Sequence, residues 1–457
     1  MSGPSQFTGT SVLVAGAGVS GVSAATALAE AGAKVTVTDG NEARLATITG
    51  VGTALGLTEP PPGTDLVVTS PGWRPDTPLL AAAAARGIEV IGEVELAWRL
   101  DQESEDGPRE WLVVTGTNGK TTTVGMLEHI LRAAGVDVVA CGNIGLPVVE
   151  AVRAGHRVLA VELSSFQLHW SPSVRPSAGA LLNIAEDHLD WHGSLEAYAG
   201  AKAAVLTGKV AIGGVDDPLV ARLLAAAPAP LKIGVTLGEP EPGQFGLADG
   251  HLVDRVHEAV LMPAAEVRPG GPPGLADALV AAALARAHGV PPEAVREGLR
   301  GFQPSAHRAA PVAEVDGVRY VDDSKATNPH AAAASLHAHD RVIWVAGGLL
   351  KGASVERLVA EAAPRLAGVV LLGADRDVIA AALARHAPEV PVRTVTEGDD
   401  GAMVSVVRAA SAMARPGDVV LLAPAAASMD MFTDYTHRGR AFAQAVREVL
   451  QDRAGDR

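Results

Sequence analysis

Short apolar runs alternate along the chain with alanine-rich segments of helical period, and this alternation predicts an α/β fold. The first run, Ser11 to Ala15, precedes a glycine-rich turn, a helix that extends to Ala31 and a second strand from Lys34 to Thr38. This order is that of a mononucleotide-binding unit. Later strands are predicted at Leu66 to Thr69, Ile88 to Ile91, Trp111 to Val114, Val158 to Glu162, Ala178 to Leu182, Arg341 to Ala346, Val369 to Leu372, Val392 to Val395 and Val419 to Ala423.

Breaks in the pattern divide the chain into three α/β domains in a row, which we place at residues 1–106, 107–305 and 306–457. Asp101 to Pro108 is polar, acidic and non-periodic, as expected of a linker. Gly238 to Pro273 is rich in glycine and proline, which predicts hairpins and loops. The third domain begins near His307, ahead of a hairpin that spans Ala313 to Val321.

Composition supports this division and excludes some partners. A chain of 457 residues is too long for one ordinary core. Hydrophobic residues make up 48% and aromatic residues 3%, which suits parallel sheets covered by alanine-rich helices. The formal net charge of −15 and the lack of a Lys/Arg-rich run argue against a nucleic-acid partner.

Cysteine usage and hydropathy indicate the compartment. Cys141 is the single cysteine, so an intrachain disulfide is excluded and a reducing compartment is favoured. The N-terminus lacks a signal pattern, and no apolar run is long enough to span a bilayer. We therefore expect a soluble cytoplasmic protein that works without a membrane partner. Separately from these features, we expect it to act as a monomer.

The most informative motif runs from Thr115 to Thr122, between a predicted strand and a predicted helix. Its backbone N–H groups and the helix N-terminus offer a positive concavity to phosphate oxygens. Lys120 supplies a point charge for the terminal phosphates, and the Thr121 hydroxyl can reach Mg²⁺. The full motif has a glycine where this chain has Val114, so the match is to a shorter variant. The motif predicts a nucleoside triphosphate site, against the alternative of a plain turn.

A second glycine cluster follows the first strand. Gly16, Gly18 and Gly21 fit a dinucleotide fingerprint, with Asp39 in the place of the ribose-binding acid. The pattern shows only that the backbone can approach a diphosphate. A nicotinamide cofactor and a nucleotide sugar both carry one, and a tight turn without a ligand is the remaining interpretation.

Polar residues collect at strand ends in the middle segment. Glu162 ends a strand beside the phosphate loop, where a carboxylate can hold Mg²⁺ directly or through water. Asp187, His188 and Asp190 share one loop, which favours a site over a solvated turn. Lys202 lies in a predicted helix from Leu195 to Leu206, and the pattern alone places it on the surface.

Three loops in the third segment also follow strands: Asp322 to Pro329, Gly347 to Gly352 and Pro424 to Asp430. Helix capping explains part of the first loop, but a lysine between a carboxylate pair and a threonine is more than a cap needs. Open α/β sheets bind ligands at the carboxyl ends of their strands. We therefore expect the three loops to form one pocket.

Together these motifs resemble the Mur ligases of peptidoglycan synthesis, and among them the D-glutamate-adding members, over essentially the whole chain. The motifs that carry the resemblance are Gly116 to Thr122, Gly142 to Gly145, Val161 to Leu168, Glu186 to His188, His307-Arg308, Asp323 to Asn328 and Ala425 to Gly439. The resemblance implies a Rossmann-like first domain, a central phosphate-loop ATPase domain with a mostly parallel sheet, and a Rossmann-like third domain.

The resemblance also implies a reaction. ATP would phosphorylate the terminal carboxylate of UDP-N-acetylmuramoyl-L-alanine, and the amine of D-glutamate would attack the acyl phosphate and release phosphate. Two polyanions must meet, so cations are the main requirement. The resemblance implies two Mg²⁺ ions and a carbamylated Lys202, whose carbamate would give a metal an anionic oxygen ligand.

Site residues follow residue by residue from the same resemblance. The catalytic residues would be Lys120, Glu162, His188 and Lys202, and the metal ligands Thr121, Glu162, His188 and Lys202. ATP would contact Gly116, Thr117, Asn118, Gly119, Lys120, Thr121, Thr122, His307, Arg308, Asp323 and Lys325. The nucleotide sugar would contact Gly18, Val19, Ser20, Asp39, Ser70, Pro71, Gly72, Asn143 and His188. D-Glutamate would contact Thr327, Lys351, Ser428, Met429 and Tyr435.

The chain departs from its relatives at three places. Gly40 and Asn41 follow Asp39 where relatives can have threonine and arginine, so the resemblance does not define the uracil and phosphate contacts there. The family's paired asparagines near the adenine are replaced by Gly274 and Asp277. Ala426 stands where relatives often have cysteine, a change expected to affect packing more than chemistry.

Three other functions remain as alternatives. A nicotinamide-dependent oxidoreductase would use the first glycine cluster but leave the second phosphate loop without a role. A sibling ligase for another amino acid, or a folylpolyglutamate-type synthetase, would share the phosphate loop but is not expected to combine Asp323 to Asn328 with the Ser428 loop. A non-catalytic nucleotide sensor would not need the lysines and carboxylate of two metal sites.

Overall fold

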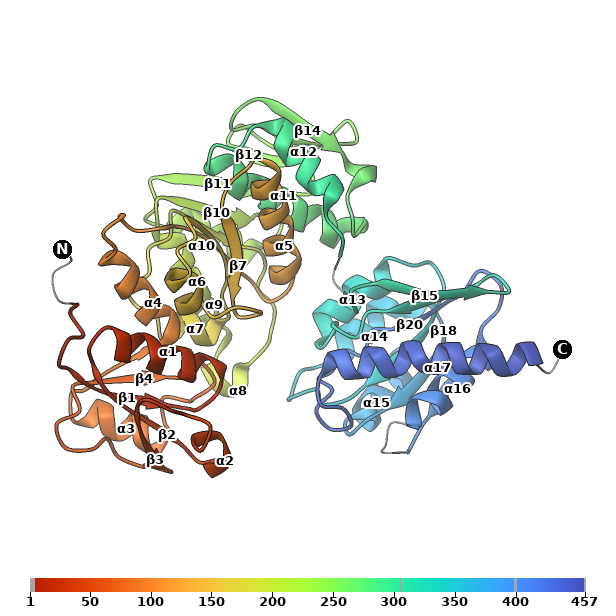
Figure 1. Ribbon diagram of the computed structural model, residues 1–457. Coiled ribbons are helices and arrows are strands. Elements are labelled where there is room, and N and C mark those ends of the chain that lie inside the picture. The colour runs from red at the N-terminus through yellow and green to blue at the C-terminus, as the bar shows by residue number, and fades with distance from the viewer. Residues whose placement is uncertain (1–4, 305, 398–400, 456–457) are drawn as a thin grey trace. The chain divides into compact units, whose positions relative to one another are not determined.

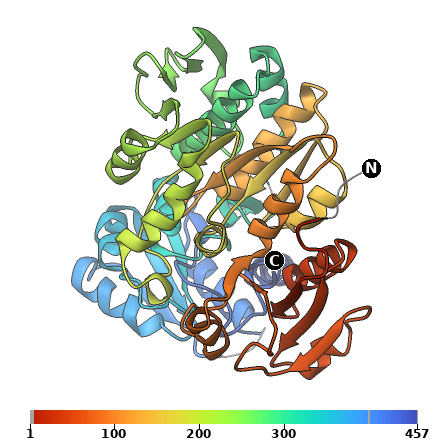
Figure 2. The same cartoon turned by 90° about the vertical axis from the view of Figure 1, so that its left-hand side faces the viewer.

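The α/β prediction is confirmed by the computed structural model, which describes residues 5–304, 306–397 and 401–455. These residues form three β-sheets, each with helices packed against it (Figure 1; Figure 2). The first and middle sheets belong to one compact unit, which runs to Phe302 without residues 185–190 and 271–273. Those two short segments and the residues from Gln303 onward form the second unit.

The first sheet is fully parallel, in the order β3-β2-β1-β4-β5. Its elements are β1 (Ser11–Ala15), α1 (Val19–Glu30), β2 (Lys34–Asp39), α2 (Glu42–Leu45), β3 (Gly52–Leu55), β4 (Leu66–Thr69), α3 (Pro78–Ala85), β5 (Glu89–Gly92) and α4 (Glu93–Gln102). The order changes direction beside β1, which places the glycine turn after β1 at the switch point where such sheets bind ligands.

The middle sheet has nine strands, in the order β14-β13-β12-β11-β10-β9-β6-β8-β7. Its first part contains β6 (Glu110–Thr115), α5 (Lys120–Ala133), β7 (Val138–Gly142), α6 (Val148–Arg153), β8 (Val158–Glu162), α7 (Ser165–His169), β9 (Ala178–Leu181), α8 (Leu189–His192), α9 (Leu195–Ala203) and a 3₁₀ turn (Ala204–Thr207). Its second part contains β10 (Val210–Gly214), α10 (Pro218–Ala226), β11 (Leu231–Val235), β12 (Gln244–Ala248), β13 (His251–Asp254), β14 (Ala259–Pro263), a 3₁₀ turn (Ala264–Glu266), α11 (Gly271–Ala287) and α12 (Pro292–Gly301). Strands β12 to β14 pair antiparallel, which confirms the predicted hairpins.

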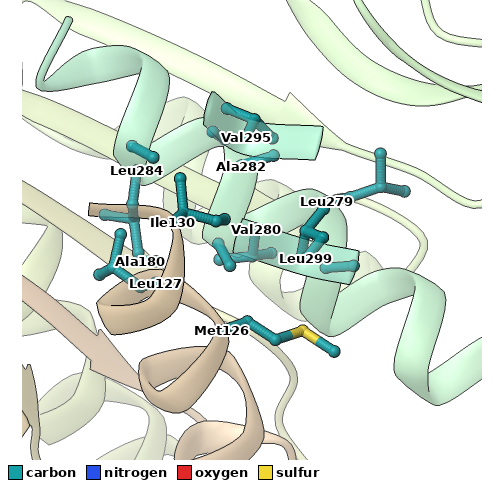
Figure 3. Packing of buried hydrophobic residues seen from close by; sticks show 14 of the residues in the cluster. Met126, Leu127, Ile130, Ala180, Leu279, Val280, Ala282, Leu284, Val295 and Leu299 are labelled. Carbon is teal, nitrogen blue, oxygen red and sulfur yellow. The ribbon is translucent and has the colours of Figure 1, made fainter. Parts of the chain in front are cut away.

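Helices α5, α11 and α12 cover one face of the middle sheet, and α5 directly follows the phosphate loop (Figure 3). Leu127 and Ile130 of α5 are fully buried among Leu284 of α11 and Val295 of α12. A Cβ on Gly298 would lie 2.3 Å from Cα of Ile130, so α5 and α12 approach closely because this residue is a glycine.

Helix α4 joins the first sheet to the middle sheet. The predicted linker from Asp101 to Pro108 is wrong in its first residues, which belong to this helix. The helix continues to Gln102, and Asp101 is fully buried in it. Asp101 accepts from Nη1 of Arg109 at 2.7 Å and from Nε1 of Trp111 at 2.9 Å. The polar Asp101 contributed to the linker prediction, but its carboxylate forms an internal ion pair with Arg109.

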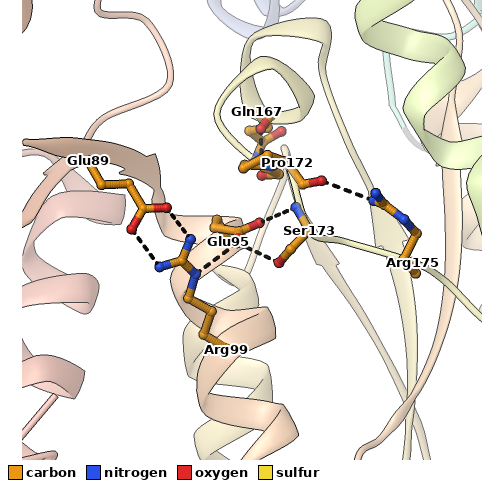
Figure 4. Close-up of polar contacts among 8 residues, drawn as sticks. Glu89, Glu95, Arg99, Gln167, Pro172, Ser173 and Arg175 are labelled. Carbon is orange, nitrogen blue, oxygen red and sulfur yellow. Dashed lines mark hydrogen bonds and ion pairs between the residues drawn. The ribbon is translucent and has the colours of Figure 1, made fainter. Parts of the chain in front are cut away.

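A second polar network ties α4 to the loop after α7 (Figure 4). Arg99 binds Glu89 at 2.6 Å and Glu95 at 2.9 Å. The Glu95 carboxylate, fully buried, also accepts from the hydroxyl of Ser173 at 2.6 Å. The first domain is therefore held to the middle domain by hydrogen bonds to buried carboxylates.

The third domain has a six-stranded sheet in the order β15-β16-β20-β17-β18-β19. Its elements are β15 (Ala310–Val315), β16 (Val318–Asp322), α13 (Pro329–His337), β17 (Val342–Gly347), α14 (Glu356–Ala362), a 3₁₀ turn (Ala363–Arg365), β18 (Leu366–Leu372), α15 (Arg376–His386), β19 (Val392–Thr394), α16 (Ala402–Met413), β20 (Val419–Leu422) and α17 (Tyr435–Gly455). Trp344 and Leu371 pack with residues of α13 to α15, whereas Ile343 and Val370 pack with residues of α16 and α17. This alternation along each strand buries both faces of the sheet.

None of the helices within the described ranges is long and apolar enough to cross a membrane.

Candidate active site

The phosphate loop lies at the carboxyl end of β6, as predicted. Helix α5 begins at Lys120 behind Gly119, whose φ of +89° lies in the left-handed region that favours glycine. The side chain of Asn183 accepts from the backbone N–H of Asn118 at 2.9 Å and donates to its carbonyl at 3.2 Å. The loop is thus shaped by the strand end of β9 beside it. Thr121 is half-buried and Thr122 is buried in the first turn of α5.

Two lysines converge on one carbonyl of this loop. Nζ of Lys120 donates to the carbonyl of Gly116 at 2.9 Å and to that of Thr117 at 3.0 Å. Nζ of Lys202 donates to the same Gly116 carbonyl at 2.8 Å. Lys202 is 2% exposed, so its placement on the surface from pattern alone is wrong. Two ammonium groups that share one acceptor repel each other.

Glu162 lies next to this loop at the end of β8, which pairs with β6. The carboxylate is 3% exposed, and its Oε1 accepts from Nδ2 of Asn143 at 2.8 Å. A Cβ on Gly142 would lie 2.2 Å from the carbonyl oxygen of Glu162, so that glycine allows the Asn143 loop to approach. The structure therefore brings Asn143, Glu162 and the phosphate loop together at the carboxyl ends of neighbouring strands in the middle sheet.

Tyr198 belongs to this cluster and was missed from the sequence. Its hydroxyl lies 3.0 Å from Oγ1 of Thr117, and Nζ of Lys202 lies 4.8 Å from the centroid of its ring. Tyr198 and Lys202 are four residues apart on α9 and so share a helix face. That spacing was the available signal, but the surface interpretation of Lys202 hid it.

The two substitutions near the expected adenine position have local reasons. Oδ1 of Asp277 accepts from the hydroxyl of Thr123 at 3.2 Å, and a Cβ on Gly119 would lie 2.3 Å from that oxygen. A Cβ on Gly274 would lie 1.9 Å from the carbonyl oxygen of Pro269, which excludes a side chain there. Asp277 therefore packs directly against the phosphate loop.

The glycines of the first cluster differ in whether packing requires them. A Cβ on Gly16 would lie 2.3 Å from Oγ of Ser70, and one on Gly21 would lie 1.9 Å from the Gly16 carbonyl oxygen. The fold itself requires these two glycines. A Cβ on Gly18 would meet no described heavy atom within 4 Å, so packing does not explain that glycine. Val19, which follows it, is 72% exposed.

Asp39 shapes this turn through both carboxylate oxygens. They accept from the backbone N–H groups of Ala17 at 2.7 Å and Asn41 at 2.8 Å. Burial alone would raise the pKa of Asp39, but these backbone hydrogen bonds and the charge of Arg44 hold it below its ordinary value. Ser70, Pro71 and Gly72 begin the turn after β4, where Trp73 N–H donates to the Ser70 carbonyl at 3.1 Å. Ser20 lies half-buried in the first turn of α1.

His188 lies in the segment 185–190, which belongs to the second compact unit. Its φ is +53°, and its Nε2 lies 3.6 Å from Oδ2 of Asp187. Within the part of the chain that the structure describes, no group of three or more His, Cys, Asp or Glu side chains is arranged to hold a metal ion.

The three predicted loops of the third domain are joined by backbone hydrogen bonds. Ala425 N–H donates to the carbonyl of Ala326 at 3.0 Å, and Leu349 and Ala427 exchange two bonds of 2.9 Å. They follow β16, β20 and β17, which are neighbours in the sheet. The structure thus brings together the loops that carry Lys325, Lys351 and Ser428.

Predicted ATP residues of this domain lie around one carboxylate pair. Nδ1 of His307 lies 2.6 Å from Oδ2 of Asp322, and a Cβ on Gly439 would lie 2.2 Å from that ring nitrogen. Oδ1 of Asp323 accepts from the backbone N–H of Ala309 at 3.2 Å. Burial raises the pKa of Asp323 above its ordinary value. Arg308 beside them is half-buried.

The predicted D-glutamate residues differ in exposure. Ser428 is 4% exposed, whereas Met429 is 73% exposed. Lys351 is exposed and has a φ of +53°. Thr327 and Tyr435 are half-buried, and the Tyr435 ring lies 4.0 Å from Nζ of Lys325.

Arg438 is a second residue whose place the sequence did not reveal. It is 1% exposed and donates to the carbonyls of Ser324 at 2.9 Å and Ala426 at 3.0 Å. Burial lowers its pKa to about 10, which leaves it protonated at neutral pH. A buried cation therefore bridges two of the three loops.

Family models and individual relatives point to the same family along the chain. Residues 10–92 match the Mur ligase MurD-like N-terminal domain, residues 114–244 the Mur ligase middle domain, and residues 307–426 the Mur ligase glutamate ligase domain. A UDP-N-acetylmuramoylalanine–D-glutamate ligase of Nocardia farcinica is 54% identical, over 97% of this chain and 97% of its own length. One of Thermobifida fusca is 55% identical, over 97% and 99%.

A comparison with solved structures gives the same family fold. A crystal structure of MurF from Acinetobacter baumannii superposes with a TM-score of 0.61 at 17% identity, and covers 98% of this chain and 93% of its own. That likeness confirms the three-domain α/β architecture. With three family models and relatives above 50% identity over nearly its full length, this chain belongs to the Mur ligase family.

Proposed function

We propose that the chain is an ATP-dependent ligase that joins D-glutamate to UDP-N-acetylmuramoyl-L-alanine in peptidoglycan synthesis. The relatives named for this reaction match it over 97% of its length. One structural observation carries the proposal. Lys120, Lys202 and Glu162 lie at the phosphate loop, at the carboxyl ends of the neighbouring strands β6 and β8. A plain turn or an oxidoreductase has no use for that arrangement.

The first step would be phosphoryl transfer. A carboxylate oxygen of the UDP-linked substrate attacks the γ-phosphorus of ATP, the bond to the β-phosphate oxygen breaks, and ADP leaves. Lys120 and the N–H groups at the start of α5 would bind the phosphates and stabilise the charge that develops on the transferring group. Asn143 would orient the acceptor carboxylate.

The second step would be attack by the D-glutamate amine on the acyl carbon. A tetrahedral intermediate forms, the amine loses a proton, and the bond to phosphate breaks. Lys351 and the hydroxyls of Thr327, Ser428 and Tyr435 suit the two carboxylates of D-glutamate, because charge-assisted hydrogen bonds fix anions strongly. His307, Arg308, Asp323 and Lys325 would contribute to ATP binding.

Two Mg²⁺ ions fit the residues present if Lys202 is carbamylated. Glu162 and Thr121 offer hard oxygen donors, but three protein acids are not gathered together in the described residues. Mg²⁺ commonly uses one or two carboxylates together with substrate phosphates, and a carbamate on Lys202 would add a second anion. It would also remove the repulsion between Lys202 and Lys120. The ions would neutralise the phosphate charges, with His188 as a further ligand.

We assign the substrates to domains accordingly. The nucleotide sugar would bind residues 1–106, ATP residues 107–305, and D-glutamate residues 306–457. Gly18 and the exposed Val19 support the first assignment, since packing does not account for either. Because ATP and UDP-linked precursors occur in the cytoplasm, we propose that the enzyme acts there.

The test is phosphate release by the purified chain with ATP, Mg²⁺ and UDP-N-acetylmuramoyl-L-alanine. D-Glutamate, L-glutamate, L-alanine, L-serine, glycine and a diamino acid are supplied one at a time. Release confined to D-glutamate supports the proposal. Release with another amino acid would make the chain a sibling ligase, and no release with any would favour a nucleotide sensor.

A further inference from the structure

Two residues assigned above to different substrates touch each other in the third domain. Nζ of Lys325, assigned to ATP, lies 4.0 Å from the centroid of the Tyr435 ring, assigned to D-glutamate. An ammonium over an aromatic face is attracted by the negative potential of the ring. Building on the proposed function, we propose that Tyr435 is a positioning residue whose ring holds the Lys325 ammonium in place for phosphoryl transfer.

The backbones that carry the two groups are tied together. The hydroxyl of Ser324, the residue before Lys325, donates to the carbonyl of Tyr435 at 2.8 Å. Nε of Arg438 donates to the same hydroxyl at 3.0 Å, and its Nη2 to the Ser324 carbonyl at 2.9 Å. The first turn of α17 and the loop after β16 therefore hold their relative position, and the ring and the ammonium extend from a rigid base.

This arrangement gives the aromatic ring a task that a glutamate contact alone does not require. Lysine has four rotatable side-chain bonds, and fixing its ammonium costs rotamer entropy. A ring that already holds the ammonium lowers that cost before ATP binds. The phenol hydroxyl is not needed for this attraction, because the ring face supplies it.

The contact can be measured without any turnover. The chain has seven lysines, so reductive ¹³C-methylation gives few NMR resonances, and Lys325→Arg identifies the one from Lys325. We expect that resonance to be shifted upfield by the ring current in the wild type and in Tyr435→Phe. In Tyr435→Leu the upfield shift should be lost, while the other resonances stay in place and report an intact fold.

Phe432→Leu is the matched control. It removes an aromatic ring three residues before Tyr435, and the centroid of that ring lies 5.5 Å from that of the His437 ring. Its Lys325 resonance should remain shifted. An unshifted Lys325 resonance in the wild type, or the same shift in Tyr435→Leu, would overturn the proposal.

Kinetics then distinguish positioning from a plain acceptor contact. At saturating D-glutamate, Tyr435→Leu should lower kcat about 3- to 30-fold, and Tyr435→Phe should recover most of that loss. If Tyr435→Leu raised only the KM for D-glutamate and left kcat unchanged, the positioning role would be refuted. A wild type without ligase activity would refute the proposed function instead, and the resonance would still report whether the contact exists.

Discussion

The buried carboxyl group of Glu93 should make the first compact unit less stable as the pH rises through neutrality. Glu93 begins α4, is 2% exposed, and its Oε1 accepts from the backbone N–H of Val149 at 2.6 Å. Burial, opposed in part by that hydrogen bond, raises the pKa of Glu93 from 4.5 to about 7. The nearby charge of Glu150 adds to the rise.

The direction in which pH changes the free energy of unfolding follows from proton binding. Between pH 4.5 and 7 the unfolded chain has released this proton and the folded chain has kept it, so rising pH favours unfolding. A shift from 4.5 to about 7 corresponds to about 3 kcal/mol, of which about 2 to 3 kcal/mol falls between pH 5 and 8. The full effect is reached once the folded group also ionises.

The variant Glu93→Gln keeps an acceptor for the Val149 N–H and removes the titrating carboxyl group. Urea unfolding followed by tryptophan fluorescence gives the free energy of unfolding at each pH. The wild type should lose about 2 to 3 kcal/mol more than the variant between pH 5 and 8. Equal pH slopes in the two proteins would show that ionisation of Glu93 does not cause this pH dependence. Glu95→Gln is the control, since it breaks the ion pair with Arg99 and should destabilise the protein at both pH values.

Three further predictions test the site and the core. Lys202→Ala should abolish ligation, and a short carboxylic acid should partly restore it, whereas near-normal activity without additive would exclude the carbamate. Lys351→Ala should raise the KM for D-glutamate more than that for ATP, and the opposite pattern would exclude its acceptor role. Gly298→Ala should lower the free energy of unfolding by about 3 kcal/mol, because the new Cβ would meet the backbone of Ile130. Gly301→Ala in the same helix has open space and should be neutral or slightly stabilising, and an equal loss in both would contradict the packing argument.

Local chemistry made the strands and the phosphate loop predictable. Ser11–Ala15, Leu66–Thr69 and Val158–Glu162 have the predicted bounds, because short apolar runs between turns have few alternatives in a buried parallel sheet. The hairpin predicted from Ala313 to Val321 turns at Asp316 and Gly317, which both adopt a positive φ.

Long-range burial of polar groups could not be predicted from pattern. Asp101 looked like a linker residue and Lys202 like a surface residue, yet both are buried by segments distant in sequence. The resemblance to a family located Lys202, but neither it nor the pattern revealed Tyr198 or Arg438. Those two act through contacts with backbone or hydroxyl groups, which leave no periodic signal.

Lysines are few in this chain, and most of them have a role under the proposed function. The chain has seven lysines among its 37 basic residues, and four of them, Lys120, Lys202, Lys325 and Lys351, are assigned to substrates or metal. Surface ion pairs such as Arg153 with Glu30 use arginine instead. Arginine stays protonated and cannot form a stable carbamate at neutral pH, whereas a lysine can lose its proton and react with CO₂. A Lys202→Arg variant should therefore keep the buried cation yet remain inactive, and near-normal activity of that variant without an additive would argue that a positive charge alone is what the site needs.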